Sequence, residues 1–130
     1  MKWLPLGLLL VLACHRQLPE NTFLIGSDAA LRLAIGDHAR ATRKGSDLLT
    51  FLEVVEDSRC PRGVQCIQAG RAVVRVAVLR DGRLTTETLT VEGNRLRTDA
   101  GTLLFQQLEP YPDAAVENPE PYRLVVRFME

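Results

Sequence analysis

The chain has 130 residues, of which 46% are hydrophobic and 25% are charged, so it is long enough for one globular domain and too apolar for a disordered segment. Its 16 basic and 16 acidic side chains cancel, which gives no electrostatic reason to expect nucleic acid as a partner. Three cysteines are an odd number, so they cannot all pair with one another within the chain.

The N-terminal segment has the layout of an export signal. Lys2 supplies a positive start, residues 4–13 (LPLGLLLVLA) are almost wholly apolar, and the small residue Ala13 precedes Cys14. Such a segment in a helix rises about 15 Å, half of a bilayer's hydrocarbon core, so it is too short to span a membrane. We therefore predict a signal peptide over 1–13 and a polar tether over 14–27 that leads into the folded domain.

The predicted cleavage site, Val11-Leu12-Ala13-Cys14, resembles the lipobox of bacterial lipoproteins. The resemblance implies that the Cys14 thiol carries diacylglycerol, with palmitate-like chains, and that Cys14 becomes the first mature residue. Because His15 rather than Asp follows, the resemblance also implies the outer membrane, facing the periplasm, in a two-membrane bacterium. The membrane is then a partner through this lipid, since two or three acyl chains hold far better than one. The alternative is ordinary secretion, because Val11 and Ala13 also suit a small-residue cleavage rule.

Cys60 and Cys66 remain once Cys14 is assigned to the lipid. An exported chain meets an oxidising compartment, where such a pair forms a disulfide. The intervening PRGVQ contains a Pro and a Gly that let the chain turn, and a loop this short makes the bridge worth about 2 kcal/mol. The alternative is a metal pair, but zinc pairs usually enclose about two to four residues and need two further ligands.

Residues 28–130 show strand-like alternation instead of a sustained helical period. The clearest strand is the last one, where one face carries Tyr122, Leu124, Val126 and Phe128. Residues 31–35 alternate likewise, residues 48–56 are apolar on both faces as in an interior strand, and residues 102–108 form a short strand. Residues 109–121 hold four prolines and four acids, so we predict a loop there.

Residues 71–79 and 84–92 flank Asp81-Gly82, which favours a two-residue type I′ hairpin turn. The resulting register places the apolar pairs at the end away from the turn and leaves the tip solvated; the pairs are Val78–Thr85, Val76–Glu87, Val74–Leu89 and Ala72–Val91. About six to seven strands predict an all-β domain over 28–130, an antiparallel β-sandwich (immunoglobulin-like) or a small barrel. A core of this size needs no cofactor to fold, and we predict none.

The segment 56–70 (EDSRCPRGVQCIQAG) resembles a pattern of small, mostly uncharacterised bacterial exported proteins and lipoproteins. The matching residues are Asp57, Ser58, Arg59, Cys60, Pro61, Cys66, Ala69 and Gly70, and the resemblance extends through the β region to the Pro-Tyr-Pro at 110–112. The chain departs from the pattern at Gln68, where Trp is common. The resemblance implies a β fold and an envelope location, and it implies no activity.

Two interpretations of this segment stay open. In the structural one, Asp57 and Ser58 bond to backbone in a turn, and Arg59 forms a surface ion pair with Glu56 or Asp57. Gly63 and Gly70 would supply positive φ or a bulge. In the recognition one, the disulfide holds the loop 57–70 ready for an envelope protein, a peptidoglycan fragment or an anionic sugar. Its candidate contacts are Asp57, Ser58, Arg59, Arg62 and Gln65.

The chain lacks the sequence motifs of nucleophilic, metal-dependent and phosphate-binding sites. His38 is the only histidine of the predicted domain, in a Gly-Asp-His-Ala context typical of a turn. We therefore predict a non-catalytic interaction or structural module. One alternative is a lipoprotein that handles copper or zinc through His38 with acidic side chains or reduced cysteines, and a third is an enzyme with an unrecognised carboxylate site.

Two oppositely charged segments are predicted to be solvated loops: the basic residues 37–47 and the acidic residues 109–120. As alternatives, they face each other, or the basic loop touches lipid head groups near the anchor.

Overall fold

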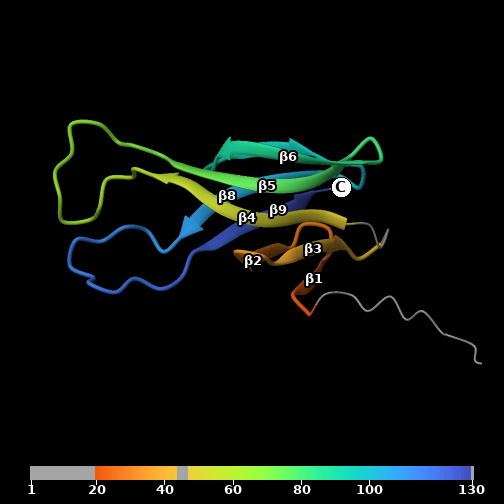
Figure 1. Ribbon diagram of the computed structural model, residues 1–130, viewed down its shortest axis with the longest axis horizontal. Helices are drawn as coiled ribbons and strands as arrows, with labels where there is room; N and C mark the ends of the chain where they lie inside the picture. The colour runs from red at the N-terminus through yellow and green to blue at the C-terminus, as the bar shows by residue number, and fades with distance from the viewer. Residues whose placement is uncertain (1–19, 44–46, 130) are drawn as a thin grey trace, which may run out of the picture.

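The computed structural model describes residues 20–43 and 47–129, and the predicted signal peptide and Cys14 lie outside this range (Figure 1). The described residues form nine strands. They are β1 (Thr22–Ile25), β2 (Ala30–Ala34), β3 (His38–Ala41), β4 (Asp47–Asp57), β5 (Ala72–Arg80), β6 (Arg83–Thr90), β7 (Asn94–Arg97), β8 (Thr102–Glu109) and β9 (Arg123–Met129). None of the described residues forms a helix long and apolar enough to cross a bilayer.

The strands form two sheets that enclose one core, so the predicted all-β sandwich is confirmed. The first sheet has the order β1-β3-β4-β5-β6 and the second has the order β2-β9-β8-β7. Neighbouring strands are antiparallel except for β1 and β3, which are parallel. Three phenylalanines, Phe51, Phe105 and Phe128, come from both sheets and are almost completely buried. Full burial of each such side chain is worth about 1.5–3 kcal/mol.

The predicted hairpin is present with its predicted register. Asp81 and Gly82 have φ values of 52° and 69°, the two positive values that a type I′ turn requires. Val78 pairs with Thr85 and the next two predicted pairs follow, while the N–H of Val91 donates to the carbonyl of Ala72 at 2.9 Å. In β9, the face predicted to be buried is buried at Leu124, Val126 and Phe128.

Three short strands were not predicted, which is why the count of six to seven strands is too low. β1 lies within the predicted tether 14–27, so the β-fold begins before residue 28. β3 occupies part of the basic segment predicted to be a loop, with Ala39 and Ala41 buried, and β7 lies between the predicted strands 84–92 and 102–108. Each has only four residues, too few for alternation to stand out, and each forms because a neighbouring strand offers a pairing edge.

Three expected apolar positions are exposed for local reasons. Ile35 is 51% exposed because β2 ends at Ala34 and the chain turns at Gly36, which has positive φ. β4 is an interior strand as predicted, but Leu52 and Val55 are exposed at two register shifts, so its second face is not covered throughout.

Two long loops emerge at the same end of the sandwich, on the left in Figure 1. The disulfide loop, residues 58–71, joins β4 to β5, and the acidic loop, residues 110–122, joins β8 to β9. We call this end of the molecule the loop end. The acidic segment is largely irregular, as predicted, and it lies beside the disulfide loop, whereas β3 of the basic segment lies right of centre in Figure 1.

Candidate functional site

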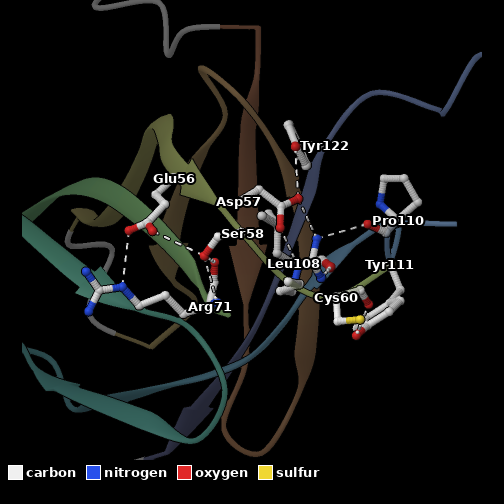
Figure 2. A network of polar contacts seen from close by, with 10 residues as sticks. Glu56, Asp57, Ser58, Cys60, Arg71, Leu108, Pro110, Tyr111 and Tyr122 are labelled. Carbon is white, nitrogen blue, oxygen red and sulfur yellow. Dashed lines mark hydrogen bonds and ion pairs between the residues drawn. The ribbon is translucent and has the colours of Figure 1, made fainter. Parts of the chain in front are cut away.

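Arg59 joins the two loops of the loop end, and it is 5% exposed. Figure 2 labels its partners Asp57, Leu108 and Pro110. Its guanidinium donates to both carboxylate oxygens of Asp57, from Nε to Oδ1 at 2.7 Å and from Nη2 to Oδ2 at 2.9 Å. Nη1 also donates to the carbonyl of Leu108 at 2.7 Å, and Nη2 donates to that of Pro110 at 3.1 Å. The arginine therefore ties the end of β4 to the end of β8 and to the start of the acidic loop.

Tyr122 completes this buried ion pair from the other side of the acidic loop. Its hydroxyl donates to Asp57 Oδ2 at 2.9 Å. The hydrogen bond from Arg59 holds the pKa of Asp57 below its ordinary value, against the opposing effect of burial. Burial and the bond to Asp57 raise the pKa of Tyr122, and the bond to Asp57 raises the pKa of Arg59.

The expectation that Arg59 forms an ion pair on the surface is therefore wrong, because its pair with Asp57 is buried. The Arg59 and Asp57 side chains are only 4% and 11% exposed, and carbonyls of β8 and of the acidic loop supply the remaining acceptors. The recognition interpretation expected Asp57 and Arg59 to contact a partner, but neither residue presents its charge freely. They hold the two loops in position instead.

Ser58 closes the base of the disulfide loop. Its backbone N–H donates to the carbonyl of Arg71 at 2.9 Å, and its hydroxyl accepts from the N–H of Arg71 at 3.0 Å. The same hydroxyl donates to Glu56 Oε1 at 3.1 Å, and Arg71 donates to the other oxygen of Glu56. Gly70 has φ of 68°, as predicted, and a Cβ at this position would lie 1.7 Å from the carbonyl oxygen of Ser58. The close approach requires glycine.

The predicted disulfide between Cys60 and Cys66 is present, with the two Cα atoms 5.9 Å apart. The loop tip is exposed, both at Gln65 within the disulfide ring and at Ile67 and Gln68 just after it. Gln68, which stands where the resembling proteins commonly have Trp, therefore contributes nothing to the core.

The acidic loop is bonded to the disulfide loop at several points. The Tyr111 hydroxyl donates to the carbonyl of Cys60 at 2.8 Å, and the guanidinium groups of Arg59 and Arg62 lie 5.1 and 5.2 Å from the centre of the Tyr111 ring. The N–H of Arg62 donates to the carbonyl of Pro112 at 2.9 Å, and its carbonyl accepts from the N–H of Ala114 at 3.0 Å. The two loops form one connected structure.

A cavity of about 310 Å³ opens within the acidic loop, which supplies nine of its eleven lining residues; the disulfide loop contributes Pro61 and the end of β4 contributes Asp57. Its walls are mainly proline, tyrosine and other apolar residues, with carboxylates and no lysine or arginine; they are Asp57, Pro61, Pro110, Tyr111, Pro112, Asp113, Ala114, Val116, Pro119, Glu120 and Tyr122. A second hollow of about 350 Å³ lies across Tyr111 and includes Arg59 and Arg62. Gln65 contributes to neither hollow.

Sequence analysis found only part of this site. Of the predicted contacts, Asp57 lines the cavity and Arg62 lines the second hollow, while Ser58 closes the base of its own loop. The acidic-loop wall was missed because that segment was interpreted as a solvated loop. The Pro-Tyr-Pro at 110–112 was the available signal, since prolines fix the backbone and a tyrosine between them has a phenol to place.

The structure separates His38 from this site. His38 lies on β3, where its Nδ1 is 2.7 Å from the Thr50 hydroxyl. Over residues 20–43 and 47–129, no three His, Cys, Asp or Glu side chains gather closely enough to hold a metal ion. Comparisons with protein-family models, with curated proteins and with solved structures find no match for this chain.

Proposed function

We propose that this chain is a lipid-anchored, non-catalytic recognition module of the bacterial envelope, and that it binds its partner in the loop-end cavity. The observation that carries the proposal is the cavity of the acidic loop, a loop already fixed by the bonds from Arg59 to Pro110 and from Tyr111 to Cys60 of the disulfide loop. A binding site with prearranged walls loses less conformational entropy when its ligand binds. Concave, largely apolar sites with a few polar groups are the usual form of ligand sites.

The lining residues favour a ligand that joins an apolar group to a positive charge. Asp113 and Glu120 supply carboxylates, and no lysine or arginine lines the cavity. Tyr111 and Tyr122 offer aromatic surface to an apolar or cationic group. The occupant we propose is a segment of an envelope protein in which a lysine or arginine adjoins an apolar side chain. The charge of the cavity does not favour an anionic sugar.

The cavity is tested with two neighbouring alanines. Ala114 lines the cavity, so Ala114→Phe places a large side chain inside it. Ala115 is not a lining residue, so Ala115→Phe adds the same side chain outside the cavity. Acetyl-Phe-Arg-amide is titrated into each protein, acetyl-Phe-Glu-amide serves as the charge-reversed probe, and backbone NMR shifts report binding. We expect the arginine peptide, and not the glutamate peptide, to shift the NMR signals of residues 111–120. These shifts should also occur in Ala115→Phe and should be absent in Ala114→Phe. Equal shifts from both peptides, or binding that survives Ala114→Phe, would contradict the proposal.

The membrane anchor is tested separately at Cys14. The intact mass of the wild-type chain should show loss of residues 1–13 and addition of acyl chains, and the protein should partition into detergent. Cys14→Ser should carry no acyl mass. An acylated Cys14→Ser protein, or a wild type without acyl mass, would show that the anchor is not at Cys14.

A further inference from the structure

The outer face of the second sheet carries five exposed arginines from three of its four strands: Arg32, Arg95, Arg97, Arg123 and Arg127. In β9, the buried residues Leu124 and Val126 alternate with the two arginines, which therefore point away from the core. The register places Arg127 opposite Leu104, which in turn pairs with Arg95 on β7. Side chains paired in this way lie on the same face of a sheet.

Negative charge on this face is scarce. Glu109 is the only acidic residue in the four strands of the second sheet, and it forms an ion pair with Arg32 at 3.1 Å. Arg127 donates to the backbone carbonyl of Asp28, which leaves its positive charge in place. At the edge of the face near Arg97, the Asp99 carboxylate accepts from the backbone N–H groups of the β5–β6 turn.

The first sheet shows the opposite arrangement on its outer face. Glu53 pairs with Arg75 on the sheet, and Glu56 pairs with Arg71, the residue just before β5, so the charges balance locally. The chain is formally neutral overall, so the excess of arginine on one face is a feature of how the strands are placed. The arginines of β7 and β9 stand two strands apart, at about 10 Å, and such an array suits a surface that presents many anionic groups.

We propose that this arginine face docks on the anionic phospholipid head groups of the membrane. The inference rests on the proposed lipid anchor, because an anchor at Cys14 would hold the face close to a head-group layer. Arginine suits this occupant, since its planar guanidinium donates two parallel hydrogen bonds to one phosphate. Lipid anchors are also commonly combined with a basic patch, which adds a second attraction to the same surface. The predicted basic segment 37–47 is not required for this contact.

The test uses residues 14–130 with Cys14→Ser, so that no acyl chain contributes to binding. Removing residues 1–13 leaves the core intact, because all core residues lie between Ile25 and Phe128. Sedimentation with vesicles of phosphatidylcholine, alone or mixed with phosphatidylglycerol, measures the partition coefficient. We expect binding to the anionic vesicles only, and a decrease with added salt.

Arg95→Gln/Arg127→Gln should weaken that binding about 25-fold, at about fivefold for each arginine near the surface. The matched control is Arg71→Gln/Arg75→Gln, which removes the same charge from β5 and the residue that precedes it, on the first-sheet side of the molecule, and should leave binding within about twofold of the parent. Circular dichroism establishes that all three proteins are folded.

Equal losses in the two double variants would overturn the proposal, because net charge alone would then explain binding. Binding to dextran sulfate but not to anionic vesicles would also overturn it, in favour of a soluble polyanion. None of these outcomes depends on acylation of Cys14, which the intact mass of the wild-type chain tests separately.

Discussion

Replacing Asp57 with Asn removes one charge from the buried pair at the loop end and keeps the shape of the side chain. Arg59 would then be almost fully buried with neutral acceptors only, the carbonyls of Leu108 and Pro110 and the amide oxygen of Asn at position 57, and without the counter-charge that it bonds directly. Removing one partner of a buried ion pair typically costs about 3–5 kcal/mol. We expect Asp57→Asn to lower the free energy of unfolding at pH 7 by about that amount.

The matched control is Glu53→Gln, which breaks the ion pair with Arg75. Those side chains are 49% and 41% exposed, so the expected loss is about 0–1 kcal/mol. Urea unfolding is followed by far-UV circular dichroism, because Trp3, the single tryptophan, lies in the predicted signal peptide. A loss below about 1 kcal/mol for Asp57→Asn would refute the argument, because Arg59 would then not depend on its counter-charge.

A double-mutant cycle separates the pair from its surroundings. Arg59→Met/Asp57→Asn removes both charges while keeping much of the volume, so it should be more stable than the sum of the two single losses predicts. The difference should be at least about 1.5 kcal/mol, because each single variant leaves the other charge buried without its partner. Additive losses would show that the two side chains act independently.

Three further predictions concern the same end of the molecule. Because the pKa of Asp57 is lowered in the fold, its contribution to stability should be present above about pH 4 and lost as the pH falls further, and urea midpoints for Asp57→Asn should vary less over that range. Gly70→Ala should lower the free energy of unfolding by more than about 2 kcal/mol, because its Cβ would clash with Ser58. Gly82 has nearly the same φ but open space where its Cβ would lie, so Gly82→Ala should lower the free energy by about 1 kcal/mol. Similar losses in the two variants would exclude the clash with Ser58. Replacing Cys60 and Cys66 with serine should cost about 2 kcal/mol in the same urea assay, and an unchanged midpoint would contradict the loop-closure argument.

The strands and turns that depend only on neighbouring residues could be predicted from the sequence. The β5–β6 hairpin follows from Asp81-Gly82 and its flanking alternation, and the last strand follows from the alternation that ends at Phe128. β3 and β7 were not predicted, because four residues show too little alternation to distinguish a strand from a turn. Their formation depends on strands β4 and β8, which supply the pairing edges.

The loop end was less predictable because its contacts join distant parts of the chain. The carbonyls that receive the Arg59 guanidinium are 49 and 51 residues away in the sequence, so a local reading assigned Arg59 to the surface. The disulfide could be predicted from the cysteine count and the inferred compartment. The cavity could not, because one of its walls depends on the Tyr111 hydroxyl reaching the backbone of Cys60.

The two proposed surfaces together imply an orientation that neither implies alone. The acidic loop continues the second sheet, since β8 ends at Glu109 and β9 begins at Arg123, and the cavity opens beside that loop. The arginines point perpendicular to the same sheet. With the arginine face on head groups, the strands would lie along the membrane and the cavity would open sideways, close to the lipid surface. A partner segment near that surface could then enter the cavity while the arginine contacts stay in place, so Arg95→Gln/Arg127→Gln should leave binding of acetyl-Phe-Arg-amide in solution unchanged.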